Sequence, residues 1–534
     1  MLHGLGVRRA LTGLVLVMVL LAGFGMPLNA EVNNPLSLGI PEQTKRVIAV
    51  QIYTLWAKGD SLLEAGDLVG AEEKYRESYD LSIRMNDHFA VALSALSLGD
   101  CKARGRQYSQ AIDWYRKSLG AYAKVTDLSS RMYAAVTWQN LGNAYSELGN
   151  DAKACEAYKD GIAAIKDILP SLSGDDVCYA TDSLAYLYAD LGDAYGGTGS
   201  RAAMDAYAEA AEHSGRAAVC YRQKGQEQAA FLAETKQFFL LWQLGDTCYS
   251  VEEYQRGLAT YQKAIDLWNG FDISETCMDV ELLFGLAYGH MKLGHADGAA
   301  EALEAASKID QRLSCELDEK LAYVCQGLAM LFYDKEAYVD AAHWAKEAAA
   351  KYLSLDNNSD RALCEYIEGL SHGMLHQYRE AITCLEEAVG TLDKEGMTEE
   401  LQQVLEWLAY CRCQLTYELK ETGSLRVATS CVTHDVGNDN CPVDEARSFT
   451  SSDEKVVCWV ALDGAPHGET LRFVFISPDG LVYYEGKTEV QWNLHWYWIL
   501  INGYDAAMKT GTWTVKVYLN DKLGATIHFE LRLF

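Results

Sequence analysis

Residues 138–161 read WQNLGNAYSELGNDAKACEAYKDG. Small residues (Gly142, Ala154, Gly161) and large ones (Trp138, Tyr158) recur here at offsets of three and four, the spacing of one face of an α-helix. A small residue on that face allows a second helix to approach closely, and an aromatic ring fills the space beside it. The stretch therefore predicts two antiparallel helices joined by a turn at Gly149.

The same pattern occurs eight times along the chain, which indicates a repeat architecture. In each copy a small residue in the first helix is followed by a small residue in the second, and four residues later by Tyr, Leu or Ala. The first-helix positions are Gly59, Gly99, Gly142, Gly192, Gly245, Ala287, Ala329 and Gly369. The second-helix positions are Ala71, Ala111, Ala154, Ala203, Gly257, Ala299, Ala341 and Ala381.

These marked positions resemble the tetratricopeptide repeat family, and the resemblance covers residues 48–420, with residues 399–420 expected to form a capping helix. It implies an α solenoid of stacked antiparallel helix pairs whose first helices line an inner face that binds partner peptides. The copies are longer than the 34 residues of the family, because the second-helix positions lie 40 to 54 residues apart. The widest spacings flank the fourth repeat, where the stack is expected to bend or hinge.

The hydrophobic period changes after Gly423. Residues 456–462, 470–476 and 512–519 alternate as strands do, and Ser477-Pro-Asp-Gly and Asn520-Asp-Lys separate them as turns. Residues 425–534 are therefore predicted to form a small all-β sandwich. Its last hairpin is similar to the one that ends immunoglobulin-like domains.

The N-terminus is typical of an export signal. Arg8 and Arg9 precede an apolar run from Leu11 to Phe24, and Ala30 provides a small residue for cleavage. Residues 1–30 are therefore expected to be a signal peptide, followed by a lead-in over residues 31–47, and the protein is predicted to be secreted or periplasmic. An uncleaved anchor is the alternative. No later segment is apolar enough to span a membrane, and a formal net charge of −29 argues against nucleic acid as a partner.

Fifteen cysteines are present, and most lie among apolar residues at helical spacing, where a thiol serves as a small hydrophobic group. A structural role is therefore preferred over a metal or redox role. The favoured disulfide is Cys431–Cys441, in a loop-rich stretch.

Motifs of catalysis are weak in this sequence. Gly369-Leu-Ser371-His372-Gly373 fits the GxSxG pattern of serine hydrolases, but it falls in a predicted helix, whereas that motif requires a strand followed by a sharp turn. The sequence predicts no catalytic residue, no metal site and no cofactor, so the protein is expected not to be an enzyme.

The predicted inner face is acidic at one end and apolar at the other. The residue after each first-helix Gly or Ala, and the residue three before it, should line the groove, and we expect a basic and apolar partner segment there. Few cations lie on this face, which argues against the carboxylate-binding members of the family. The candidate groove residues are Asp60, Asp100, Asn143, Asp193, Asp246, Trp56, Trp242, Phe284, Tyr288, Met330 and Tyr366.

Two functions of different class follow. The first is an exported, non-enzymatic scaffold or adaptor that binds proteins through the groove. The second is a cell-envelope carbohydrate-binding protein whose β-sandwich recognises a polysaccharide. Trp492, Trp496 and Trp498 share one parity of a predicted strand. They are expected to form the sandwich core, but if their face is exposed they could stack on sugar rings.

Overall fold

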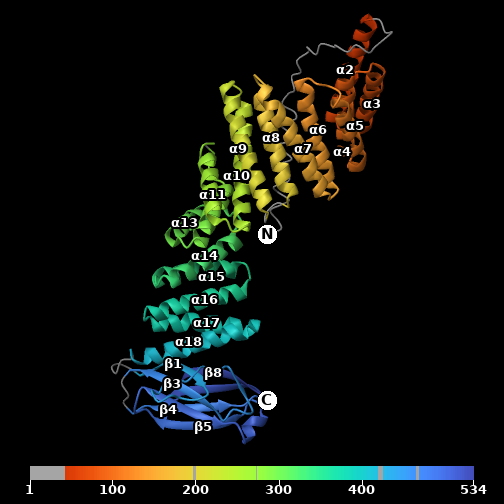
Figure 1. Ribbon diagram of the computed structural model, residues 1–534. Coiled ribbons are helices and arrows are strands. Elements are labelled where there is room, and N and C mark those ends of the chain that lie inside the picture. Colours follow the sequence, from red (N-terminus) through yellow and green to blue (C-terminus); the bar gives the residue numbers. More distant parts are fainter. Residues whose placement is uncertain (1–41, 197–199, 272, 419–424, 465–467, 534) are drawn as a thin grey trace. The chain divides into compact units, whose positions relative to one another are not determined.

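A computed structural model describes residues 42–196, 200–271, 273–418, 425–464 and 468–533 (Figure 1). The predicted signal peptide, and the lead-in up to residue 41, lie outside this part of the chain. Helix α2 begins at Glu42, six residues before the predicted start of the array. Among the described residues, none of the helices combines the length and apolar character needed to cross a membrane.

Antiparallel helix pairs follow one another as the repeat pattern predicts. Their bounds are α2 Glu42–Glu64, α3 Leu68–Arg84, α4 His88–Arg104, α5 Tyr108–Tyr122, α6 Leu128–Glu147, α7 Asp151–Ile168, α8 Asp176–Ala194, α9 Arg201–Gln223, α10 Glu227–Ser250, α11 Tyr254–Asn269, α12 Cys277–Lys292, α13 Ala296–Leu313, α14 Asp318–Asp334, α15 Tyr338–Ser354, α16 Asn358–Met374, α17 Tyr378–Glu395 and α18 Thr398–Thr416. A short 3-10 helix, Leu169–Ser171, separates α7 from α8.

Polar caps fix where several of these helices begin. The side chains of Asp67, Asp87 and Asp127 accept hydrogen bonds from backbone N–H groups in the first turns of α3, α4 and α6. Thr276 and Asp279 form a capping box at the start of α12. Such caps satisfy N–H groups that have no partner inside the helix.

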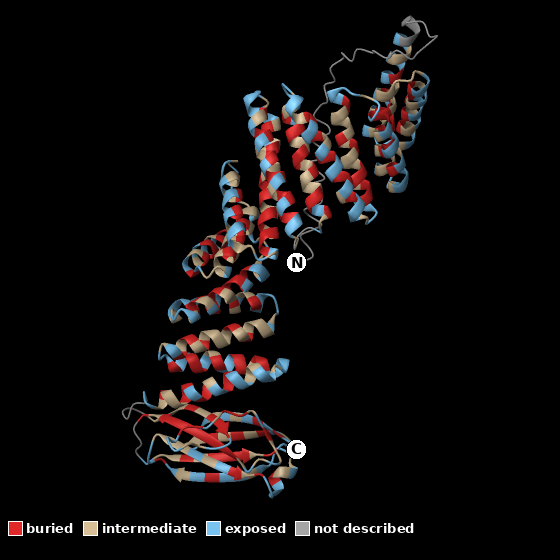
Figure 2. Ribbon diagram, viewed as in Figure 1, coloured by how far each residue is buried: buried red, intermediate tan, exposed pale blue. Residues whose placement is uncertain are grey.

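The two helices of a repeat cross at a glycine that an aromatic ring covers. A Cβ atom added at Gly59, Gly99 or Gly142 would lie less than 3.0 Å from ring carbons of Tyr75, Tyr115 or Tyr158, the tyrosine of the same repeat. Gly245 and Tyr261 show the same arrangement in the fifth repeat. Gly192, the corresponding first-helix glycine of the fourth repeat, is also buried. The second-helix positions Ala71, Ala111, Ala154, Ala341 and Ala381 are fully buried. In Figure 2 the buried positions form stripes along the helices.

The chain divides into two compact units within the fourth repeat, where the spacing between repeats is widest. The first unit comprises the residues up to Tyr195 together with Val219–Gly225. A disulfide between Cys178 of α8 and Cys220 of α9 attaches that short segment to the first unit. The second unit contains Gly196–Ala218 and all residues from Gln226 onward.

Residues 426–532 form a β-sandwich at the end of the second unit. One sheet has the order β1-β3-β6 and the other the order β2-β8-β7-β4-β5. The strands are β1 Arg426–Thr433, β2 Ser448–Thr450, β3 Lys455–Asp463, β4 Thr470–Ile476, β5 Val482–Glu489, β6 Leu494–Leu500, β7 Gly511–Leu519 and β8 Lys522–Arg532. Core residues of both sheets, including Val460, Phe473, Trp513 and Val515, form one hydrophobic cluster.

Helix α18 joins the sandwich to the helical array instead of closing an open end. Arg412 of α18 is buried and donates to Glu445 at 2.8 Å and to the hydroxyl of Thr429. Burial raises the pKa of Glu445, and the Arg412 charge opposes that rise. Loss of either Arg412 or Glu445 would destabilise the fold, because the remaining partner would be a buried charge without compensation.

Cys413 of the same helix forms a disulfide with Cys441. The predicted pair Cys431–Cys441 is therefore wrong. Cys431 is a buried free thiol on β1, where it packs with Trp459 and Ala461. The docking of α18 brings Cys413 to Cys441, and this contact between distant elements is invisible in the local sequence. A third disulfide, between Cys277 and Cys315, was not predicted.

The helix crossing generates a prediction at Gly142. Replacing Gly142 with Ala should destabilise α6 and α7 by about 1–3 kcal/mol, because the added methyl group overlaps the Tyr158 ring. The sixth repeat pairs Ala287 with Leu303, both fully buried. Adding Tyr158→Leu to Gly142→Ala should therefore recover part of the loss. Hydrogen exchange of the α6 and α7 amides measures the effect.

The matched control is Gly120→Ala. Gly120 is an exposed helical glycine of α5 with open space around its Cβ position. This substitution should be neutral, or stabilising by up to about 1 kcal/mol. Equal protection in Gly142→Ala and the parent would contradict the proposed role of the crossing.

Candidate partner-binding surfaces

The acidic positions predicted to line the groove accept hydrogen bonds from the tyrosines that cover the helix crossings. Tyr75 donates to Asp60 at 2.5 Å and Tyr115 donates to Asp100 at 2.8 Å. The third and fifth repeats show the same contact, from Tyr158 to Asn143 at 2.7 Å and from Tyr261 to Asp246. Asp193 lies exposed on α8. The Asp and Asn side chains of these four repeats are thus part of the packing between the two helices.

Asp100 also contacts the next repeat, because Asn140 of α6 donates to the same carboxylate oxygen at 2.9 Å. Burial raises the pKa of Asp100 to about 6, against the opposing effect of the Tyr115 and Asn140 hydrogen bonds. Below that pH the Asp100 carboxyl is mostly protonated, so it lacks the negative charge that was expected of a groove residue.

Asp190 of α8 is a second half-buried acid in the first unit, and sequence reasoning missed it. Gln139 donates to its carboxylate at 2.6 Å, and burial raises the pKa of Asp190 to about 7. Trp56 likewise bonds within the array, to the hydroxyl of Ser97 at 2.8 Å. These contacts link first helices of neighbouring repeats. The predicted groove residues Trp56, Asp60, Asp100 and Asn143 therefore all have partners inside the first unit.

The second unit presents a more exposed surface, which we call the aromatic band. It consists of Phe284, Tyr288, Tyr323, Met330 and Tyr366 on the first helices α12, α14 and α16. The ring of Tyr288 lies 6.2 Å from that of Phe284 and 6.3 Å from that of Tyr323. Tyr323 is 46% exposed and Met330 is 53% exposed.

Tyr323 was missed because it lies seven residues before Met330, outside the two positions used to define the groove. Trp242 is half-buried on α10, with its ring 6.4 Å from that of Phe239. Trp242 therefore lies on a first helix, but its ring belongs to a cluster that continues through Phe239 to Phe238.

Two lysines lie on the aromatic band, although few cations were expected there. The ammonium group of Lys292 is 5.4 Å from the ring of Tyr288 and donates to the Tyr323 hydroxyl at 3.3 Å. Lys320 lies 5.6 Å from the ring of Phe284 and forms an ion pair with Glu281 at 2.6 Å. The surface is therefore aromatic with a cationic rim, and cation–π contacts hold the rim in place.

The tryptophans of β6, Trp496 and Trp498, and Trp492 just before the strand lie on the surface, so the expectation that the three form the sandwich core is wrong. Trp492, Trp496 and Trp498 are between 36% and 73% exposed. Trp496 pairs across the sheet with Trp459 of β3, so both side chains project to the same outer face. Trp459 is buried there and donates to the carbonyl of Asn440.

The GxSxG motif lies inside α16, as predicted. Ser371 is buried and donates to the carbonyl of Ile367 at 2.7 Å, so its hydroxyl is used within the helix. The strand and sharp turn of a hydrolase nucleophile are therefore absent at this motif.

Residues 135–167, which comprise most of the third repeat, match the tetratricopeptide repeat family model. The helical array is therefore a tetratricopeptide-like solenoid architecture, as the recurring pattern predicts. No curated relative matches the sequence.

Solved structures with similar helical arrays share little sequence with this chain. BtubC from P. vanneervenii is 15% identical, with a TM-score of 0.32, over 50% of this chain and 91% of its own. A signal-transduction ATPase with a tetratricopeptide repeat sensor from Pyrococcus horikoshii is 15% identical, with a TM-score of 0.35, over 69% of this chain and 56% of its own. A tetratricopeptide repeat protein from Parabacteroides merdae is 14% identical, with a TM-score of 0.27, over 60% of this chain and 98% of its own. Similarities of this size transfer no ligand or activity to this chain.

The raised pKa of Asp100 predicts a pH-dependent stability in the first unit. The folded protein retains the Asp100 proton up to about pH 6, whereas the unfolded chain loses it near the ordinary value of 3.8. The stability of α4 and α5 should therefore fall by about 1–3 kcal/mol as the pH rises from 4 to 7. In Asp100→Asn this part of the fall should disappear, because an amide does not titrate in this pH range. The fold should be retained, since the amide oxygen can still accept the Tyr115 hydroxyl, as Asn143 does for Tyr158.

Hydrogen exchange of α4 and α5 amides, corrected for the intrinsic effect of pH, measures this change in the full chain. Asp113→Asn, an exposed position on α5, is the control and should retain the parent pH dependence. An unchanged slope in Asp100→Asn would contradict the assigned protonation.

Proposed function

We propose that this protein is a non-enzymatic scaffold that binds a partner protein along the aromatic band of α12, α14 and α16. The observation that carries the proposal is the exposure of Tyr323 next to the rings of Tyr288 and Phe284, with Met330 exposed two turns further along α14. Large exposed aromatic and sulfur-containing side chains on a rigid surface are typical of the residues that dominate protein interfaces. The tetratricopeptide-like fold supports the same class of function.

The partner segment is expected to be apolar where it contacts the band. Burial of the Tyr323 and Met330 side chains would provide most of the affinity. The net charge of −29 favours a segment that also carries basic residues. Lys292 adds a local cation that would favour a carboxylate of the partner at the rim of the band. The same acidic excess supports the exclusion of nucleic acid.

An exported location is part of this proposal. The three disulfides within the described residues are of the kind that persists in oxidising compartments. The N-terminal signal pattern supports the same location.

The test begins with a photo-crosslinking amino acid at position 323, with position 339 as control, in intact cells of the source organism. Val339 is a similarly exposed hydrophobic residue on the second helix of the same repeat. A protein captured at position 323 and not at position 339 is then purified. Its affinity is measured against Tyr323→Ala with Met330→Ala and against Val339→Ala with Leu353→Ala.

The band variant should bind about ten- to thirtyfold more weakly, through faster dissociation, because it removes the exposed centre of the contact surface. The control variant should bind like the parent protein. Equal capture at both positions, or equal affinity of both variants, would exclude the band as the binding surface.

Exposure of Trp492, Trp496 and Trp498 supports a second candidate function, the binding of a cell-envelope polysaccharide by the β-sandwich. Each indole presents a flat apolar face with a polar N–H at its edge, which suits a surface that is only partly buried by its ligand. On the same outer sheet face, residues 434–446 cover β3 and Arg412 of α18 contacts β1, whereas Trp496 and Trp498 of β6 are exposed.

Retention of the full chain on insoluble peptidoglycan, with cellulose as a second matrix, tests this candidate. Trp496→Ala with Trp498→Ala should abolish retention, because it removes the two rings that share one sheet face. Tyr504→Ala, an exposed aromatic residue elsewhere in the same domain, is the control. Failure of the parent protein to be retained on either matrix would eliminate both as ligands and leave the protein-binding proposal intact.

A further inference from the structure

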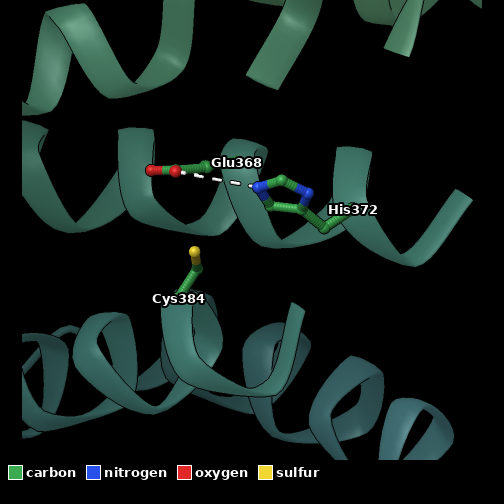
Figure 3. Close-up of side chains that lie close together, drawn as sticks. All are labelled: Glu368, His372 and Cys384. Atoms are coloured by element: carbon green, nitrogen blue, oxygen red, sulfur yellow. Dashed lines mark ion pairs between the residues drawn. The ribbon is translucent and has the colours of Figure 1, made fainter. Parts of the chain in front are cut away.

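Three metal-binding side chains converge between the two helices of the eighth repeat (Figure 3). Glu368 and His372 lie one turn apart on α16, and Cys384 reaches toward them from α17. One potential ligand atom from each residue lies within 4.8 Å of the other two. His372 Nε2 is 3.8 Å from the nearer carboxylate oxygen of Glu368.

A fourth residue orients the imidazole for binding. Nδ1 of His372 is 2.7 Å from the side-chain oxygen of Gln377. A carbonyl oxygen can only accept, so Nδ1 carries the hydrogen and Nε2, which faces Glu368, has a free lone pair in the neutral ring. Histidine ligands of metals are typically held in this way through their other ring nitrogen.

The surroundings are acidic and only partly open to solvent. The side chains of His372 and Glu368 are 21% and 14% exposed. Glu365, one turn before Glu368, forms an ion pair with Arg361 at 3.3 Å, and its other carboxylate oxygen is buried without a hydrogen-bond partner among the described residues. The Glu368 carboxylate beside a thiol and an imidazole is a combination that favours a divalent cation. The Cys384 thiol is also hydrogen-bonded to Glu368, so this carboxylate contacts both the imidazole and the thiol.

We propose that Glu368, His372 and Cys384 bind a divalent transition-metal ion, with Zn²⁺ as the preferred ion. Sulfur, nitrogen and carboxylate oxygen are the donors that Zn²⁺ takes from proteins, at about 2.0–2.3 Å. Tetrahedral coordination at those lengths separates ligand atoms by about 3.5 Å. Side-chain rotations that move the ligand atoms by about 1 Å would bring all three to that separation. Binding releases the thiol proton of Cys384 to solvent. The fourth position remains open to water.

The site would cross-link α16 to α17 and is independent of the partner-binding proposal. The other cluster of possible ligands among the described residues, Cys413 with Asp439 and Cys441, is already closed by the Cys413–Cys441 disulfide. The eighth-repeat cluster keeps its thiol free.

Titration of the chelator-treated full chain with Co²⁺ tests the proposal, because Co²⁺ replaces Zn²⁺ and absorbs light according to its ligands. The parent protein should bind one Co²⁺ per chain and show a thiolate-to-cobalt charge-transfer band that Zn²⁺ abolishes. Cys384→Ser should remove that band. Gln377→Ala should weaken binding about 10- to 100-fold while retaining the band. His372→Asn and Glu368→Gln should weaken binding at least as much.

Cys155→Ser is the matched control, because Cys155 of α7 is the other half-buried free thiol outside this cluster. That variant should bind Co²⁺ like the parent, and circular dichroism should show equal helix content in all variants. Absence of a charge-transfer band in the parent protein, or its persistence in Cys384→Ser, would overturn the proposal.

Discussion

The close crossing of two helices at one glycine is the constraint on which most of the array depends. At Gly59, Gly99 and Gly142 the absence of a side chain leaves room for the tyrosine ring of the following helix. That ring fixes both the distance between the helices and the position of its own hydroxyl. The hydroxyl then reaches the residue directly after the glycine, as in the contact from Tyr115 to Asp100. One packing rule thus determines where the acidic side chains of the early repeats are held, and it couples their protonation to the stability of the fold.

The local part of this structure could be predicted from the sequence, because it depends on periodicity. The small and aromatic positions of the repeats and the alternation of Trp513, Val515 and Val517 identify the helix pairs and the last hairpin. The disulfides could not be predicted in this way, since each joins residues from different elements. A signal did exist: Cys178 and Cys220 are 42 residues apart and Cys277 and Cys315 are 38 apart. Such separations, close to the repeat length, return the chain to the same end of a helix pair.

The misplaced tryptophans have a different cause. Alternation shows that Trp496 and Trp498 share a face of β6, but it does not show which face is covered. In β3 both faces are buried, one by the sandwich core and the other by residues 434–446, where Val436 packs against the cluster of Trp459 and Ala461. Residues 434–446 do not extend over β6. Trp496, which pairs with Trp459 across the sheet, and Trp498 are therefore left at the surface. The buried contact of Arg412 with Glu445 and the Cys413–Cys441 disulfide explain why residues 434–446 are fixed in this position. The β-sandwich therefore depends on the helical array for part of its burial, which period-two patterning alone does not reveal.

The aromatic band and the hydrogen-bonded acids are two outcomes of the same packing rule. In the first, second, third and fifth repeats the second helix supplies a tyrosine, and its hydroxyl donates to the Asp or Asn that follows the crossing glycine. The sixth and seventh repeats replace the tyrosine by Leu303 and Ala345, both fully buried and without a hydroxyl to offer. A carboxylate at the following position would then have no partner at the crossing, and Tyr288 and Met330 stand there instead. Loss of the internal donor thus removes the hydrogen bond that holds an acid at this position, which is why apolar side chains occupy it from the sixth repeat onward.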